Sequence, residues 1–254
     1  YQGDFNEIKN NLNQCIDSVN GMTDEARNLA SAAVEGRLDA RADPSKYSGD
    51  YYQLIKGFND TLDAVIGPLN VAAEYIDRIS KGDIPEKITD EYKGDFNEIK
   101  NNLNQCIDGL GGLVEANNVL QRMAVNDHTL SVEGSYEGIY AEVGQAVNEV
   151  RERLLHLTET AQNVAQGDLQ DLEKYKQIGN GTGRRSENDK IVPAFIAMMQ
   201  NINDLIEETV QLADAGKSGQ LDYRADASKF QGSFYELASG VNDTLDAVIG
   251  PLNV

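Results

Sequence analysis

The chain has 254 residues and a formal net charge of −20, from 42 acidic and 22 basic side chains. This balance argues against nucleic acid and anionic membrane surfaces as partners, because binding to either needs basic patches on the protein. No uninterrupted apolar run approaches the roughly 18 residues that suggest a membrane-spanning helix. With only two cysteines, the composition fits a reducing compartment, so we expect a cytoplasmic location.

One short phrase occurs six times along the chain. In each copy an aromatic residue is followed by apolar residues three and seven positions later, and in five copies also eleven positions later. This spacing predicts a helix with one apolar face. We predict a bundle core and relay face at Phe5, Ile8, Leu12, Tyr51, Leu54, Phe58, Leu62, Phe96, Ile99, Leu103, Ile107, Tyr140, Val143, Val147, Phe195, Met198, Ile202, Phe234, Leu237, Val241 and Leu245. An asparagine follows the third residue of every copy, at Asn13, Asn59, Asn104, Asn148, Asn203 and Asn242.

Another helix precedes most copies and is expected to end at a glycine, as helices often do just past their C-terminus. These glycines are Gly36, Gly82, Gly167 and Gly219, and Asn126 takes the place in one copy. A connector of about a dozen residues then leads to the second helix. Apolar residues in the connectors are expected to anchor them on the helices, at Leu38, Ile84, Ile88, Leu169 and Leu221.

No turn-forming segment separates a second helix from the first helix of the next copy. The sequence therefore predicts helices that continue from one repeat into the next. Pro68 and Pro251 lie at two of these junctions, where a proline either begins or kinks a helix. We predict that helix rotation is absorbed at these two positions.

These signals divide the chain into an incomplete unit and five further units. The incomplete unit is a second helix at residues 1–19. The units that follow are 20–66, 67–109, 110–154, 155–206 and 207–254, and the last includes the start of a further first helix. The fourth unit carries an insertion at about 179–188, which we interpret as flexible. Each unit is too small to bury a core alone, so stacking or oligomerisation must stabilise it.

The sequence offers no arrangement of residues typical of catalysis or metal binding. The two histidines, His128 and His156, have no partners at metal-ligand spacing. The glycine-rich segment at 179–185 lacks the Gly-Lys-Ser/Thr ending of a phosphate-binding loop. We therefore expect no enzyme activity, no cofactor, no metal and no small-molecule substrate.

The order of helix, Gly-x-Leu/Ile, connector and a helix with apolar-x3-apolar-Asn resembles the HAMP domain. The best matches are Gly36–Arg41 with Gly57–Asn59, and Gly219–Arg224 with Val241–Asn242. The resemblance covers essentially the whole chain as an array of concatenated HAMP domains. The Asp-Glu-x-Gly that often opens the family's second helix is reduced here to a single acid, at Asp50 and Asp95, for example.

The resemblance implies an all-α fold of parallel homodimeric, coiled-coil-like four-helix bundles stacked end to end into a rod. The implied partners are a second copy of the chain, further HAMP units and a signalling output domain of the same chain. Any link to a membrane would come through parts outside these residues, with this chain as the cytoplasmic part of an anchored receptor.

Three functions remain open at this stage. The first is a signal relay in a chemotaxis transducer of the methyl-accepting kind, and the second is the same array in a sensor histidine kinase. The third, from another class, is a passive helical spacer, which would favour short turns of about 2–8 residues between helices. Apolar steps of 3, 4, 4 and 3 depart from a pure heptad, so we expect each bundle to have two packings that differ in helix rotation.

Overall fold

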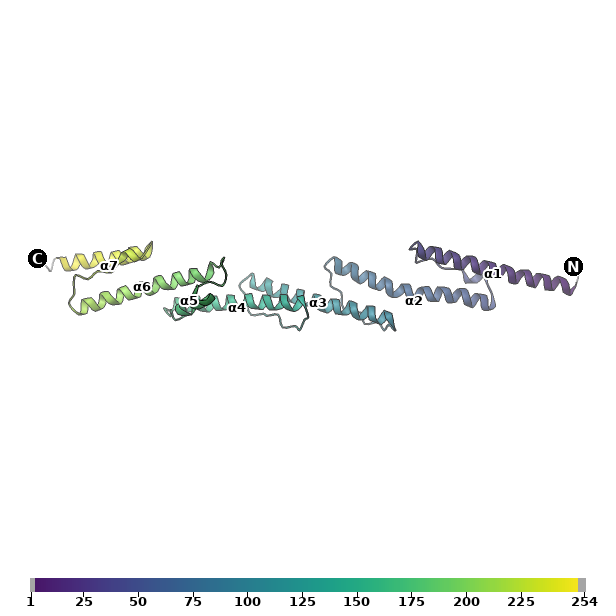
Figure 1. Cartoon of the computed structure of the whole chain (residues 1–254), viewed down its shortest axis with the longest axis horizontal. Helices are drawn as coiled ribbons and strands as arrows, with labels where there is room; N and C mark the ends of the chain where they lie inside the picture. Colours follow the sequence, from purple (N-terminus) through teal and green to yellow (C-terminus); the bar gives the residue numbers. More distant parts are fainter. Residues whose placement is uncertain (1–2, 251–254) are drawn as a thin grey trace. The chain divides into compact units, whose positions relative to one another are not determined.

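The structure is a computed structural model and describes residues 3–250. Within that range the chain forms helices and connectors and no strand, so the predicted all-α class is confirmed. The helices are α1 (Asp4–Val34), α2 (Gly49–Ser80), α3 (Asp95–Met123), α4 (Ile139–Ala165), α5 (Asp171–Gly181), α6 (Ile191–Lys217) and α7 (Ser233–Ile249), as Figure 1 shows. Two short 3-10 turns, η1 (Pro44–Lys46) and η2 (Ala227–Lys229), lie in connectors.

The chain divides into two compact parts, residues 1–148 and 149–254, which are described separately. In the first part, α1 contacts α2 and α2 contacts α3. The Cys15 thiol lies 3.5 Å from the Tyr51 hydroxyl and joins α1 to α2. In the second part, α5 contacts α6, and α7 contacts the 3-10 turn of its own connector.

The long helices are shared between consecutive repeats, as predicted. Helix α2 runs from Gly49 to Ser80 through Pro68, which is half-buried and stays inside the helix. Helices α1 and α3 likewise continue past the predicted boundaries at residues 19 and 109. The predicted junction at Pro251 lies outside the described residues.

The first helices end as the glycine pattern predicts. At the end of α2, Gly82 has φ +80° and its N–H donates to the Ile79 carbonyl, while the Asp83 N–H donates to the Arg78 carbonyl. This pair of bonds is the Schellman motif, which satisfies two of the free carbonyls at a helix end. The same pair recurs at Gly36, Gly167 and Gly219, and at Asn126 with φ +61°.

The residues buried within a single chain lie beside the predicted core face rather than on most of it. On α2, Ile55 is fully buried whereas its neighbour Leu54 is 45% exposed. On α6, Met199 is fully buried whereas Met198 is 37% exposed. On α2 and α6 the contacts inside one chain therefore use one edge of the amphipathic helix and leave much of the predicted face open.

The fourth repeat differs from the sequence prediction. The connector ahead of the insertion expected at about 179–188 forms α5, which begins at Asp171 and was not predicted. Leu172 and Tyr175 of α5 are buried against Val192 and Met199 of α6. The sequence gives this segment apolar residues three apart and hence an apolar helix face, but the glycines that follow it obscured the helix. The flexible insertion itself stays a prediction.

Candidate functional site

The asparagine that ends each repeated phrase binds the connector of its own unit. The Asn59 side chain accepts the Ala42 N–H at 3.0 Å and donates to the Ala42 carbonyl at 2.8 Å. The amide thus satisfies both polar backbone groups of Ala42, a residue that is 4% exposed. We call this pair of bonds the asparagine clasp.

The asparagine clasp occurs in four connectors. It joins Asn104 to Ile88 at 2.7 and 3.0 Å, and Asn148 to Val132 at 2.9 Å for both bonds. It joins Asn242 to Ala225 at 2.9 and 2.8 Å. Asn203 is different, because its amide donates to Glu207 on its own helix at 2.7 Å. The clasp therefore marks the units whose connector is extended.

An arginine adds a second link in the first and fifth units. Arg41 donates twice to the Asp63 carboxylate, at 2.9 and 2.6 Å, and also to the carbonyls of Leu38 and Ala40. Arg224 makes the matching bonds to Asp246, to Leu221 and to the carbonyl of Tyr223. In the second unit the ion pair Lys87–Asp108, at 2.6 Å, takes this place. The connector is thus fixed to the second helix through both its backbone and its charges.

Glutamates on the first helices hold the other side of the connectors. Glu208 on α6 is 5% exposed and accepts from Lys229 and from the Asp226 N–H. The Lys229 ammonium, and next the Asp226 N–H, hold the pKa of Glu208 below its usual value. In the first unit Glu25 accepts from Lys46 at 2.9 Å. Each of these connectors therefore bridges both helices of its unit.

The third unit uses the same principle with other groups. Glu115 on α3 accepts the Glu133 N–H at 2.8 Å and the Tyr136 hydroxyl at 2.8 Å. The Glu133 N–H, followed by the Tyr136 hydroxyl, lowers the pKa of Glu115. Glycines on α3 allow close contact with α4 and the connector. A Cβ at Gly109 would lie 2.3 Å from the Tyr140 ring, and one at Gly112 would lie 2.9 Å from the Tyr136 ring.

The predicted relay face falls into three classes of burial in the single chain. Ile107 and Val147 are buried. The half-buried members are Tyr51, Phe58, Leu62, Phe96, Ile99, Leu103, Tyr140, Val143, Phe195, Ile202 and Leu245. The exposed members are Phe5, Ile8, Leu12, Leu54, Met198, Phe234, Leu237 and Val241. A continuous core role for the whole face stays a prediction, because one chain leaves its exposed members unpacked.

The predicted connector anchors differ among themselves. Ile88 is buried, and Ile84 and Leu169 are half-buried. Leu38 and Leu221 are exposed, and their connectors instead bury Ala42 and Ala225 at the clasp. In the second and third units Ile88 and Val132 occupy the same position of the clasp. Anchoring by Leu38 and Leu221 stays a prediction.

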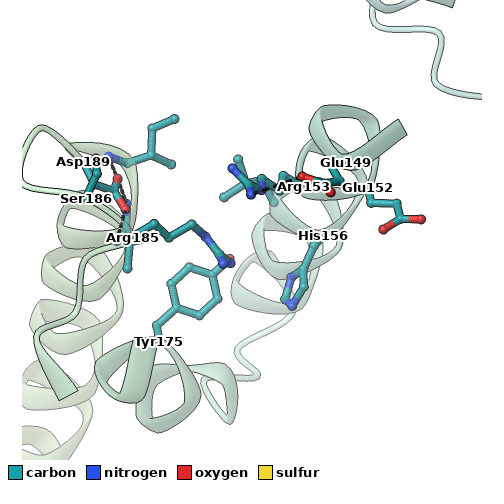
Figure 2. A pocket seen from close by; sticks show the side chains of 11 residues that line it. Glu149, Glu152, Arg153, His156, Tyr175, Arg185, Ser186 and Asp189 are labelled. Atoms are coloured by element: carbon teal, nitrogen blue, oxygen red, sulfur yellow. Dashed lines mark hydrogen bonds and ion pairs between the residues drawn. The ribbon is translucent and has the colours of Figure 1, made fainter. Parts of the chain in front are cut away.

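The fourth unit contains a polar cluster under α5. The fully buried Thr160 hydroxyl donates to Asp171 at 3.2 Å and accepts from the Tyr175 hydroxyl at 3.1 Å. Nδ1 of His156 lies 3.3 Å from the same oxygen. The pKa of Asp171 is lowered, chiefly by the hydrogen bond that it accepts from Lys174. Figure 2 shows His156 on α4 and Tyr175 on α5 facing a common cavity.

The role of the repeated asparagine was not predicted from the sequence. Its recurrence at one place after an apolar helix position was the available signal, since a polar residue beside a core face needs a partner. Arg41 and Asp63 are 22 residues apart, and so are Arg224 and Asp246. This repeated spacing is a second signal in the sequence for a pair of charges that links connector and helix. Among the described residues, no three or more His, Cys, Asp or Glu side chains are grouped so as to hold a metal ion.

Comparison with known proteins gives one family. The family model described as "HAMP domain" matches residues 46–112 and 229–254. The first match begins at Lys46 and the second at Lys229, the equivalent lysines that pair with Glu25 and Glu208. No solved structure shows a significant match to the chain. In the described part of the chain no helix is long and apolar enough to cross a membrane. Both matched segments are similar to the HAMP family, a finding consistent with a HAMP-containing signalling protein.

Proposed function

We propose that this chain is a non-catalytic array of HAMP units that relays a conformational change from a sensory input to a chemotaxis-type output. HAMP domains are signalling modules, so relay is the general role that the family match supports. The array organisation beyond residues 46–112 and 229–254 rests on the recurring structure. The asparagine clasp, the Schellman ends and the shared helices recur in units that the family model leaves unmatched.

The observation that carries the proposal is the helix shared by two units. Helix α2 is bound at Asn59 and Asp63 to the connector of the first unit. Its last turn is bound through Arg78 to Asp83, at the start of the second unit's connector. A rotation of α2 in one unit therefore moves a group that is fixed in the next unit. A relay needs such a coupled element with two arrangements.

The active form in this proposal is a parallel homodimer in which each unit forms a four-helix bundle, and the bundles stack into a rod. The exposed apolar side chains of the relay face support this form, because a large uncovered apolar face favours association. We place the dimer in the cytoplasm, with the output domain and any membrane anchor in other parts of the protein. An array that serves a sensor histidine kinase is the alternative, and a passive spacer is the alternative from another class.

The dimer is tested by cysteine cross-linking after Cys15 and Cys106 are replaced by serine. Leu54→Cys should form a disulfide between two chains, because equivalent residues face each other across a parallel dimer. Ile55→Cys is the matched control, since this neighbour is fully buried within its own chain and should cross-link poorly. Equal cross-linking at both positions, or a compact monomer in small-angle scattering, would overturn the dimer.

The relay is tested by a substitution in the second unit while the cross-linking rate is measured in the first unit. Asn104→Ala removes the clasp on Ile88 and should change the cross-linking rate of Leu54→Cys through the shared helix α2. Asn102→Ala is the control, because this neighbour is exposed on the same helix. An unchanged rate in the Asn104 variant would favour the passive spacer.

A further inference from the structure

The fourth unit forms an open cavity beside α5, a helix that the extended connectors lack. It has a volume of about 530 Å³ and lies between α4, α5 and the loop that leads into α6. Figure 2 shows Arg153 and His156 approaching it from α4, Tyr175 from α5 and Arg185 from the loop. Its volume lies within the range of about 300–1,000 Å³ that is usual for small-molecule sites.

The floor of the cavity is apolar and fixed. Tyr175 and Val192 are each 4% exposed, and Leu157 lies beside them. The Tyr175 ring stacks on Phe195 at 5.9 Å and meets the edge of His156 at 6.0 Å. The Tyr175 hydroxyl is already used by Thr160, so the ring presents its apolar part to the cavity. Such a floor suits a flat apolar body.

Two cations and three carboxylates line the cavity, and they are Arg153, Arg185, Glu149, Glu152 and Asp189. The Asp189 carboxylate accepts the backbone N–H groups of Arg185, Ile191 and Val192 at 2.9, 2.9 and 3.2 Å. Those bonds lower the pKa of Asp189 and occupy its oxygens. Within the described residues Arg185 forms no ion pair, whereas Arg153 lies 4.0 Å from Glu149. Figure 2 shows the Arg185 side chain extending across the cavity toward Tyr175.

We propose that this cavity binds a small carboxylate with a flat apolar body. The carboxylate receives two parallel hydrogen bonds from the Arg185 guanidinium, the geometry for which a guanidinium is suited. The apolar body lies against Tyr175, Val192 and Leu157, with the His156 ring at its side. The site needs α5, which supplies Tyr175, and the following loop, which supplies Arg185.

Binding would have a consequence for relay, and only this consequence rests on the proposed function. The ligand would connect α4 to the loop before α6, and both of these helices continue toward neighbouring units. An occupied site would hold the fourth unit in one helix arrangement, because a ligand favours the state that it binds better.

The test is isothermal titration calorimetry of the whole chain with benzoate as the probe. Benzamide keeps the ring without the charge, and acetate keeps the charge without the ring. We expect benzoate to bind and both controls to bind about tenfold more weakly, since each lacks one of the two contacts. Arg185→Gln should weaken benzoate binding by about tenfold or more. Arg37→Gln removes the same charge from the exposed first connector and should change nothing.

Several outcomes would overturn the site. These are no heat with benzoate, equal binding of benzamide, or equal binding by the Arg185→Gln variant. His156→Ala is a second variant at an exposed position, and with an unchanged circular dichroism spectrum it should also weaken benzoate. Sedimentation of the same samples separates the two proposals. A monomer that still binds benzoate contradicts the dimeric relay alone, and a dimer without binding contradicts this site alone.

Discussion

The first and fourth units close the same gap between two helices by different physical means. The first connector is extended and is bound by Asn59 and Arg41 through polar groups of the backbone and side chains. The fourth contains α5, whose Leu172 and Tyr175 form a small apolar core with α6. Asn203, which occupies the place of Asn59, binds only its own helix. The helical frame therefore accepts either a hydrogen-bonded strap or an extra packed helix.

This difference sets what each unit depends on. Hydrogen bonds between a connector and a helix hold specific backbone groups and respond to charge and to single side-chain changes. A packed helix depends on buried apolar area, which is nearly insensitive to charge. A cavity large enough for a ligand accompanies the packed helix in the fourth unit. Tyr175 of α5 lines that cavity, so the packed helix contributes to it directly.

The largest expected effect comes from the core under α5. Met199→Ala should lower the free energy of unfolding of the second part by about 2–5 kcal/mol, because it leaves a cavity in a fully buried site. Amide exchange of α5 and α6 should rise together, as measured by hydrogen–deuterium exchange. Denaturant unfolding of the same variant gives the stability change.

Its matched control is Met198→Ala on the adjacent and exposed position. At low protein concentration we expect little loss of stability from this variant. In a dimer that covers Met198, the loss should appear as concentration rises, whereas the Met199 effect should not depend on concentration. An equal and concentration-independent loss at both positions would contradict the division between chain core and dimer face.

A smaller effect is expected at the asparagine clasp. Asn59→Ala leaves the N–H and carbonyl of the buried Ala42 without their partner, at a cost of about 1–3 kcal/mol. The Ala42 amide should then exchange faster in the first connector. Asn203→Ala, at the equivalent place in the fourth unit, should leave the exchange of α5 unchanged. Faster exchange of α5 in that control would show that the two connectors do not differ as described.

Much of the helical frame follows from the sequence. Helical spacing predicted the shared helices, and the glycines predicted their ends, because both depend on local backbone preferences. The resemblance to the HAMP family rested on the same features. In the two best-matching segments, Arg224 binds Asp246 and Arg41 binds Asp63 in the same way.

The details that distinguish the units depend on non-local contacts and were not predicted. Whether Leu54 or Ile55 is buried depends on how α2 is rotated against its neighbours, and both residues fit an apolar stripe. The helix α5 is short, and the glycines after Ile178 indicated a loop. The cavity near Arg185 requires the loop path as well as the residue types, so the sequence carried no signal for it.

The smallest expected effect is a difference in pH dependence between two neighbouring contacts of the fifth connector. In the fifth unit, Glu208 accepts the Asp226 N–H, while Asn242 binds the adjacent residue Ala225. The pKa of Glu208 is lowered in the folded chain, chiefly by Lys229. A lowered pKa gives stability above the unfolded value of about 4.3, and this stability is lost as the pH falls through the folded value. The amide clasp does not titrate in this range.

We therefore expect the exchange protection of the Asp226 amide to fall below about pH 4.3, while that of Ala225 changes less. Protection factors measured by NMR from pH 6 down to about pH 3 give the comparison, after correction for intrinsic exchange. Glu208→Gln should remove the pH dependence of Asp226 without affecting the Ala225 bonds. The core of the fourth unit provides the second reference, because Met199 is held by apolar packing. If Ala225 and Asp226 lost protection at the same pH in the Gln variant too, another carboxylate would control it instead, such as Asp246 on α7, which binds the connector through Arg224.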